Sequence, residues 1–128
     1  MIHALDAPPD RLGDEGSGTV NSLGLIALAI TLSLLLAGVG AARTAAVRLQ
    51  AVADLAALAG AERSATSLWE DVGAAPCDAV ASVTAANGVG VESCEVLGSD
   101  CRVIVSEFVR IMGVSVEIRA KARAGQEQ

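Results

Sequence analysis

The longest pattern along the chain is a stretch without charge. No side chain between residues 16 and 42 is charged, and within residues 23–42 only Thr31 and Ser33 are polar. A run of about 20 apolar residues matches the hydrocarbon thickness of a bilayer, so the pattern predicts a transmembrane helix over residues 17–42. Thr31 and Ser33 are compatible with this prediction because their hydroxyl groups can donate hydrogen bonds to the helix backbone.

Two other structures share this pattern. A core helix of a soluble protein would be equally apolar, but the rest of this chain offers little mass to surround it. A secretory signal peptide would have its apolar region at residues 23–37 and a small-residue cleavage site near residues 39–41. Its weakness is the segment before the apolar run, which is long and acidic rather than short and basic. The transmembrane helix is the favoured interpretation.

The helical pattern continues beyond the apolar run. The following segment, residues 43–71, is rich in alanine, has no proline, and has no glycine before Gly60. Apolar residues recur there at helical spacing, at Leu49, Val52, Ala56 and Ala59. We therefore expect one helix from about Thr19 to about Leu68. Its outer half would be amphipathic, and its apolar seam would need a small domain of its own chain, or further copies, to cover it.

The remainder of the chain predicts a short helix and three strands. Gly73 and Pro76 mark a loop, and a helix capped by Asp78 is expected to end at Gly88. Strand patterns follow at residues 89–97, 101–109 and 114–124. The last strand alternates strictly, with one buried and one charged face, whereas the middle one is apolar enough for both faces to be covered.

The expected fold class is therefore α+β: a long N-terminal helix, a short helix and a three-stranded antiparallel sheet, in a pilin-like arrangement. The sheet's apolar face would pack on the outer half of the long helix. The expected segments are a leader or cytoplasmic tail (1–16), a transmembrane helix (17–42), an amphipathic extension (43–71), a small extracytoplasmic αβ domain (72–124) and a tail (125–128).

Composition excludes several function classes. The net charge is −6 and the basic residues are scattered, which argues against nucleic acid as a partner. The only histidine is His3, so the chain offers no Ser-His-Asp set and no zinc-ligand spacing. The glycines of residues 38–43 lack the third glycine of a dinucleotide fingerprint. We expect no enzymatic activity, no catalytic residue, no cofactor and no metal.

Three cysteines leave several pairings open. A Cys77–Cys94 bridge would close a loop of about 18 residues and contribute about 3 kcal/mol to a domain with a small core. A Cys94–Cys101 bridge would leave an apolar residue in the hairpin loop, and three buried thiols are the remaining alternative. The first pairing is favoured.

The orientation in the membrane rests on conflicting signals. A disulfide would place the C-terminal domain on the oxidising side of the membrane. Arg43 and Arg48 follow the apolar run and only Arg11 precedes it, which weakly favours a cytoplasmic C-terminal side. Giving more weight to the cysteines, we expect a single-pass cell-membrane protein with its C-terminal domain outside the cytoplasm.

The order of these features resembles that of type IV pilin-like subunits. Within that group the chain resembles the short TadE/TadG-like proteins of actinobacteria, which belong to tight-adherence (Flp) pilus or related secretion clusters. The matching stretches are "DEGSGTV" (residues 14–20), "RLQAVADLAALAGA" (48–61), "PCDAVASVTAANGVGVESCEVLGSDCRVIV" (76–105) and "IRAKARAG" (118–125). The resemblance spans most of the chain and rests on the order of these stretches rather than on one specific motif.

The resemblance implies a processing site. In pilin-like families a membrane peptidase cuts after a glycine on the cytoplasmic side, and the apolar helix then becomes a packing element of an assembly. Carried over here, Gly16 would be the last leader residue and Ser17 the first mature one. Asn21 would occupy the fifth mature position, where pilins usually have glutamate; it could equally be a helix-start residue near the interface. Asp14 and Glu15 stand where a basic residue is more usual.

The implied function is that of a non-enzymatic minor pilin or pseudopilin-like component of such a pilus or secretion system. The implied partners are the membrane, other pilin-like subunits, the pilus or secretion assembly platform and a prepilin peptidase. The alternative is a bitopic or Sec-secreted envelope protein with a small binding domain and no assembly role. The three cases differ in the mature N-terminus, which would be Ser17, Met1 or a residue near Ala42, respectively.

Overall fold

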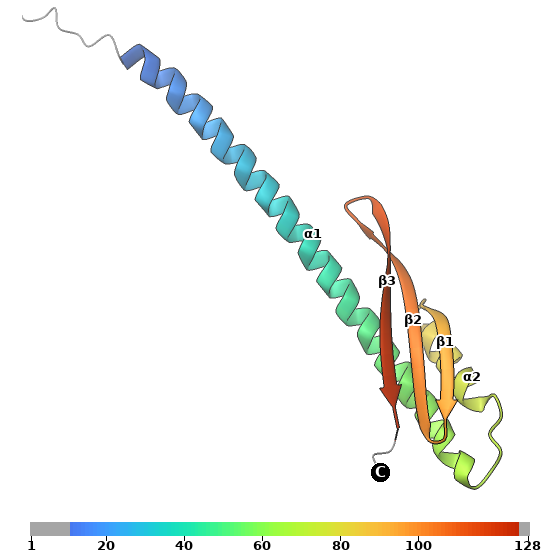
Figure 1. The fold of residues 1–128 in the computed structure, drawn as a ribbon. Coiled ribbons are helices and arrows are strands. Elements are labelled where there is room, and N and C mark those ends of the chain that lie inside the picture. The colour runs from blue at the N-terminus through green and yellow to red at the C-terminus, as the bar shows by residue number, and fades with distance from the viewer. Residues whose placement is uncertain (1–10, 126–128) are drawn as a thin grey trace, which may run out of the picture. The chain divides into compact units, whose positions relative to one another are not determined.

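The computed structural model describes residues 11–125, apart from the side chains of residues 11–15 and of Leu68. Residues 1–10 of the predicted leader (1–16), with His3, and residues 126–128 of the predicted tail (125–128) lie outside this part. The elements in chain order are α1 (Arg11–Ala65), the 3₁₀ helix η1 (Thr66–Leu68), α2 (Ala75–Ala86), β1 (Gly90–Leu97), β2 (Asp100–Ile111) and β3 (Val114–Ala124) (Figure 1). This order confirms the predicted α+β class. The chain divides into two compact units after Gly38, and the second unit, residues 39–128, holds the end of α1 and all later elements.

Helix α1 begins earlier than the sequence pattern predicts. We expected its start near Thr19, but the helical backbone begins at Arg11 and passes through Gly16 and Gly18 without interruption. Each glycine weakens a helix by about 1 kcal/mol relative to alanine, yet it keeps its N–H and does not break the helix. Proline lacks the backbone N–H and breaks a helix interior, and Pro9 is the last proline before this helix. The predicted start is therefore wrong by about two turns.

Helix α2 also begins earlier than predicted. Pro76 was assigned to a loop and Asp78 to the cap, but the helix starts at Ala75 with Ala74 at the cap position and no side-chain cap. Pro76 occupies the first turn, where its missing N–H would have no helical partner in any case. Asp78 lies in the first turn, where a carboxylate favours the helix dipole. The predicted end is correct, since Gly88 follows the helix with a positive φ of 69°.

The sheet has the strand order β1-β2-β3 and is antiparallel throughout. The predicted bounds of β3 are confirmed, whereas β2 is longer than predicted and continues to Ile111. β2 and β3 are joined by Met112 and Gly113, whose φ angles of 51° and 80° are both positive. Positive φ at both central residues is typical of a type I′ turn, whose twist matches that of the flanking strands.

The core of the second unit lies between α1, α2 and one face of the sheet. Cys101, Val103 and Val105 of β2 are buried in a cluster with Val80 of α2 and a seam of small residues on α1. The buried α1 seam comprises Leu49, Val52, Ala53, Ala56, Ala57 and Ala61, with Gly60 also buried. The predicted seam is confirmed at Leu49, Val52 and Ala56, while Ala59 is half-buried.

The other face of the sheet is open. On β2, Arg102 is exposed and Ile104 is half-buried, so the expectation that both faces of this strand are covered is wrong. On β3, the residues predicted to form its buried face are exposed at Val114 and Val116 and become covered only from Ile118 onward. No element within residues 11–125 covers this face of the sheet, so periodicity alone overestimated the burial.

A disulfide joins Cys77, in the first turn of α2, to Cys94 in β1, with their Cα atoms 5.9 Å apart. This is the pairing that the sequence favours. Cys94 lies opposite Val103 in the sheet register, while Cys101 lies opposite Val96, so the rival pair are not cross-strand neighbours. Cys101 is free and buried, and desolvation by burial raises the pKa of its thiol. It is therefore a poor competitor in disulfide exchange, which requires the thiolate.

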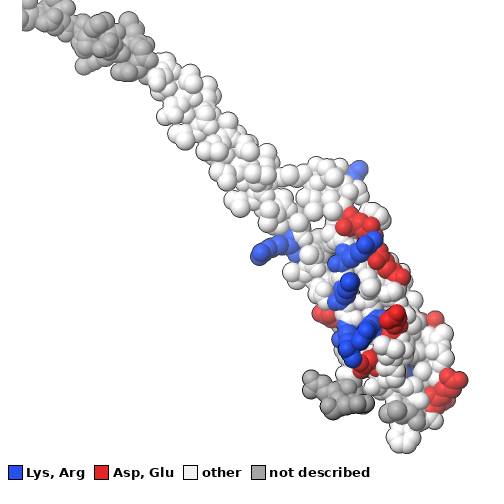
Figure 2. Space-filling model, in the orientation of Figure 1, with Lys and Arg blue, Asp and Glu red and all other residues white. Residues whose placement is uncertain are grey.

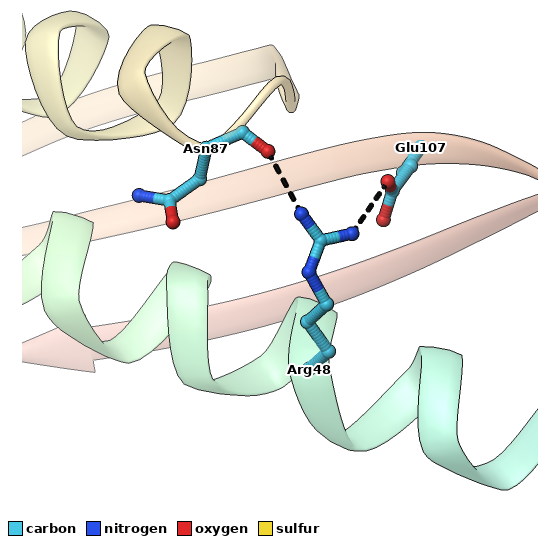
Figure 3. Close-up of polar contacts among 3 residues, drawn as sticks. All are labelled: Arg48, Asn87 and Glu107. Carbon is cyan, nitrogen blue, oxygen red and sulfur yellow. Dashed lines mark hydrogen bonds and ion pairs between the residues drawn. The ribbon is translucent and has the colours of Figure 1, made fainter.

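Arg48 ties α1 to the rest of the second unit. Its guanidinium donates one hydrogen bond to Glu107 Oε1 of β2 at 3.0 Å and another to the backbone carbonyl oxygen of Asn87 at 3.1 Å (Figure 3). Two residues further along α1, Gln50 Nε2 donates a hydrogen bond to the backbone carbonyl oxygen of Lys121 in β3 at 3.0 Å. A planar guanidinium suits two acceptors at once, so these contacts set the position of the sheet along α1.

Candidate functional site

The apolar part of α1 is uncovered in this chain. Leu23, Leu28 and Leu36 are each more than half exposed, and the same holds for most of the large apolar side chains before Gly38. Among residues 11–125, α1 is the one helix long and apolar enough to cross a membrane. A soluble protein would bury such a surface, so a core helix is not what the fold contains. This segment could span a bilayer.

Polar side chains in this segment are satisfied by the helix itself. Ser22, Thr31 and Ser33 each donate a hydroxyl hydrogen bond, 2.8 Å long, to the carbonyl oxygen four residues earlier. The prediction for Thr31 and Ser33 is thereby confirmed. An unpaired hydroxyl would be costly in hydrocarbon, so these bonds make the polar positions compatible with a lipid environment.

The predicted processing junction lies inside α1. Gly16 and Ser17 follow the helix start at Arg11, whereas we expected them to precede the first turn. A peptidase that needs an extended substrate would have to unwind these first turns, and their glycines lower the cost of doing so. A Cβ at Gly16 or at Gly18 would meet no atom within 4 Å, so packing within the described chain does not require glycine at either position.

Asn21 lies next to this junction on the helix. The structure brings together the three residues that the resemblance singled out, since Gly16, Ser17 and Asn21 line one shallow hollow with Gly18 and Val20. The hollow exists because the two glycines have no side chains. Asn21 is exposed, and its side-chain amide has no hydrogen-bond partner among the described residues. A small-residue hollow beside an unpaired amide suits close approach by another helix.

Sequence periodicity missed a second apolar face on α1. Opposite the buried seam, Val47, Leu55 and Leu58 are 70%, 55% and 52% exposed. The helical spacing of Leu55 and Leu58 was visible in the sequence, but their neighbours in the seam have the same apolar character. Which apolar residues faced inward was decided by the sheet, and those left outside form an uncovered strip.

One family model matches the chain. Its description is Putative Flp pilus-assembly TadE/G-like, and it covers residues 16–64. Comparison with curated proteins and with solved structures gave no match. The matched stretch begins at Gly16 and contains the apolar segment, Asn21 and the seam that packs on the sheet. Over this helix the chain is therefore similar to the TadE/G-like Flp pilus-assembly family.

Proposed function

We propose that this protein is a non-enzymatic minor pilin or pseudopilin-like component of a tight-adherence (Flp) pilus or a related secretion system. The observation that carries the proposal is the uncovered apolar helix, which falls within the stretch matched by the pilus-assembly family model. The end of the same helix is the packing platform of a small disulfide-bonded domain. Such a chain is suited to mechanical work: insertion, lateral packing and display of the domain.

The hollow at Gly16, Gly18 and Asn21 is the proposed lateral contact. Glycine lets two helix backbones approach closely, and the Asn21 amide would find its hydrogen-bond partner on the neighbouring helix. The strip at Leu55 and Leu58 would extend the contact outside the membrane. Partners would be other pilin-like subunits and the assembly platform, in a membrane.

In the proposed orientation, the small disulfide-bonded domain lies outside the cytoplasm. The Cys77–Cys94 disulfide supports it, because structural disulfides persist in oxidising compartments. The proposal also includes cleavage between Gly16 and Ser17 by a prepilin peptidase on the cytoplasmic side. Cleavage there would remove the N-terminal turns of α1 and leave Asn21 in the first turns of the mature helix.

The first prediction concerns the mature N-terminus. Intact mass and N-terminal sequencing of the protein isolated from native membranes should give a chain that begins at Ser17. Gly16→Leu should retain Met1, because a bulky side chain at the cleaved position blocks the peptidase. Gly18→Leu is the matched control, since its Cβ also points into open space, and it should be processed normally.

Other N-termini contradict this proposal in different ways. Retention of Met1 on all of the wild-type protein would mean a bitopic protein without processing. A soluble product beginning near Ala42 would mean a secreted envelope protein. Normal processing of Gly16→Leu would place the cut elsewhere.

The second prediction concerns lateral association. Replacing Asn21 by leucine removes an interhelical hydrogen bond worth about 1 kcal/mol, so self-association in lipid should weaken about fivefold. The measurement is energy transfer between donor-labelled and acceptor-labelled copies of the full chain in vesicles. Ser22→Ala is the control and should leave association unchanged, because Ser22 bonds to its own helix. Equal association of wild type and Asn21→Leu would show that Asn21 forms no contact between chains.

A further inference from the structure

The hairpin of β2 and β3 extends beyond the rest of the sheet. The pairing of β1 with β2 begins at Gly90, opposite Ser106, so residues 107–118 form a two-stranded ribbon with no third strand (Figure 1). Their pairing continues without a break to Ile111 opposite Val114. A two-stranded ribbon is marginally stable in water unless one of its faces is covered.

The ribbon exposes apolar side chains. Phe108, Met112 and Val114 are 71%, 59% and 62% exposed, and Val116 is also exposed. Between Glu107 and Glu117 the only charged residue is Arg110. In Figure 2 the surface at this end of the hairpin is mostly white, and most of the charged side chains lie farther along the sheet. By the pairing register, Val114 and Val116 lie on one face of the ribbon, and Phe108 and Arg110 lie on the other. The ribbon therefore exposes apolar side chains on both faces, and such a surface needs a partner that covers it.

Contacts within the second unit give the level of the ribbon along α1. Cys101 of β2 packs on Gly60, and Glu107 pairs with Arg48, so β2 runs antiparallel to α1. From Cys101 to Glu107, six strand residues span about 20 Å, and from Gly60 to Arg48, twelve helix residues span about 18 Å. One strand residue therefore advances about as far along α1 as two helix residues. The five further residues to Met112 add about 17 Å, or about eleven helix residues. The ribbon is thus long enough to pass the level of residues 39–42, the first turn of the second unit.

That turn is where the uncharged run of α1 ends. Arg43 is the first charged residue after it, and by the same rises Arg110 lies at about the same level. Neither arginine forms an ion pair within residues 11–125. Arginines beside an apolar surface are typical of segments that lie in a lipid interface, where they meet phosphate groups.

We propose that residues 108–116 insert into the boundary between headgroups and acyl chains of the bilayer, as a second membrane contact of this chain. The inference rests on the proposed membrane span of α1. Lipid is the occupant because the ribbon passes the level where the uncharged run gives way to Arg43. The apolar side chains of Phe108, Met112 and Val114 would enter the interface, and Arg110 would bind phosphate. Two contacts rather than one would then hold the folded unit on the membrane surface.

Single-tryptophan variants of the full chain test this proposal. The only tryptophan is Trp69, which is 87% exposed and lies in the turn after η1. In a Trp69→Phe background, Val114→Trp reports on the hairpin and Leu28→Trp on the apolar segment; the wild type reports on the domain far from the proposed contact. Each is reconstituted in vesicles of phosphatidylcholine and phosphatidylglycerol, with and without phosphatidylcholine brominated either near the headgroup end or near the middle of its acyl chains.

The expected result is that brominated lipid quenches Val114→Trp and Leu28→Trp several-fold more than Trp69, and that aqueous iodide does the reverse. Val114→Trp that behaves like Trp69, while Leu28→Trp is quenched by brominated lipid, would overturn the hairpin contact and leave the span intact. Leu28→Trp that is not quenched would overturn the span, and the hairpin contact with it. A third outcome is a blue-shifted emission of Val114→Trp that brominated lipid does not quench and that disappears when the protein is diluted in lipid. It would mean that the ribbon contacts a second copy of the chain, and it would overturn the proposal.

Discussion

Cys77→Ser is expected to lower the free energy of unfolding of the folded unit by about 3 kcal/mol, which is the chain-entropy estimate for a loop of this length. The effect is large relative to the total free energy of unfolding because the core is small and built mainly from alanine and valine. The disulfide also joins α2 to β1, which contact each other directly in the second unit, so its loss is expected to loosen this connection.

Hydrogen exchange of the full chain in vesicles measures this loss at the second unit alone. Backbone amides of β2 should exchange about a hundredfold faster in Cys77→Ser than in the wild type. Reduction of the wild type should reproduce this change and add nothing to the variant. Cys101→Ala is the matched control: it removes the free thiol, keeps the bridge and should cost less. Unchanged exchange in Cys77→Ser would show that the bridge contributes nothing to stability.

Gly60→Ala should destabilise the folded unit by about 2 kcal/mol, as is usual for overpacking a tight core. A methyl group there would overlap Cys101 Sγ and come within 2.9 Å of Val80 Cγ2. At an exposed helix position the same change would stabilise by up to about 1 kcal/mol through helix propensity. The steric term is larger here because both neighbours are fully buried and have no space into which to move.

The double variant Gly60→Ala/Cys101→Ala isolates the cause. Removing Sγ relieves the closest overlap and should restore part of the stability, whereas the contact with Val80 remains. Gly40→Ala is the control within the same helix, because nothing lies within 4 Å of its Cβ position. The readout is exchange protection of β2 and thermal unfolding followed by circular dichroism. A Gly60→Ala variant as stable as Gly40→Ala would contradict the close packing of α1 on β2.

Much of the fold follows from local patterns. The uncharged run, the seam at Leu49, Val52 and Ala56, and the alternation of β3 each report an intrinsic period of helix or strand. Element ends were less well predicted where the signals are weak. The helix was expected to start near Thr19, after Gly16 and Gly18, but α1 is already helical at both glycines. Pro76 suggested a loop, although the first turn of a helix accepts proline.

The candidate site was predicted in part. Gly16, Ser17 and Asn21 were singled out by resemblance, and their shared hollow follows from helical geometry. The exposed strip at Leu55 and Leu58 was not identified, because composition does not distinguish an apolar residue that meets the sheet from one that does not. The contact of Arg48 with Glu107 joins residues 59 positions apart, and no local signal marks such a pair.

The sequence by itself determined the apolar helix, the α+β class and the bounds of β3, because these depend on spacing between near neighbours. Only the tertiary structure decided which face of α1 is buried, which apolar faces of the sheet stay open, and how far the hairpin extends past β1. These features depend on strand register and on the approach of Gly60 to Cys101, which are contacts between distant parts of the chain. Periodicity records that a residue is apolar, and packing alone selects what covers it.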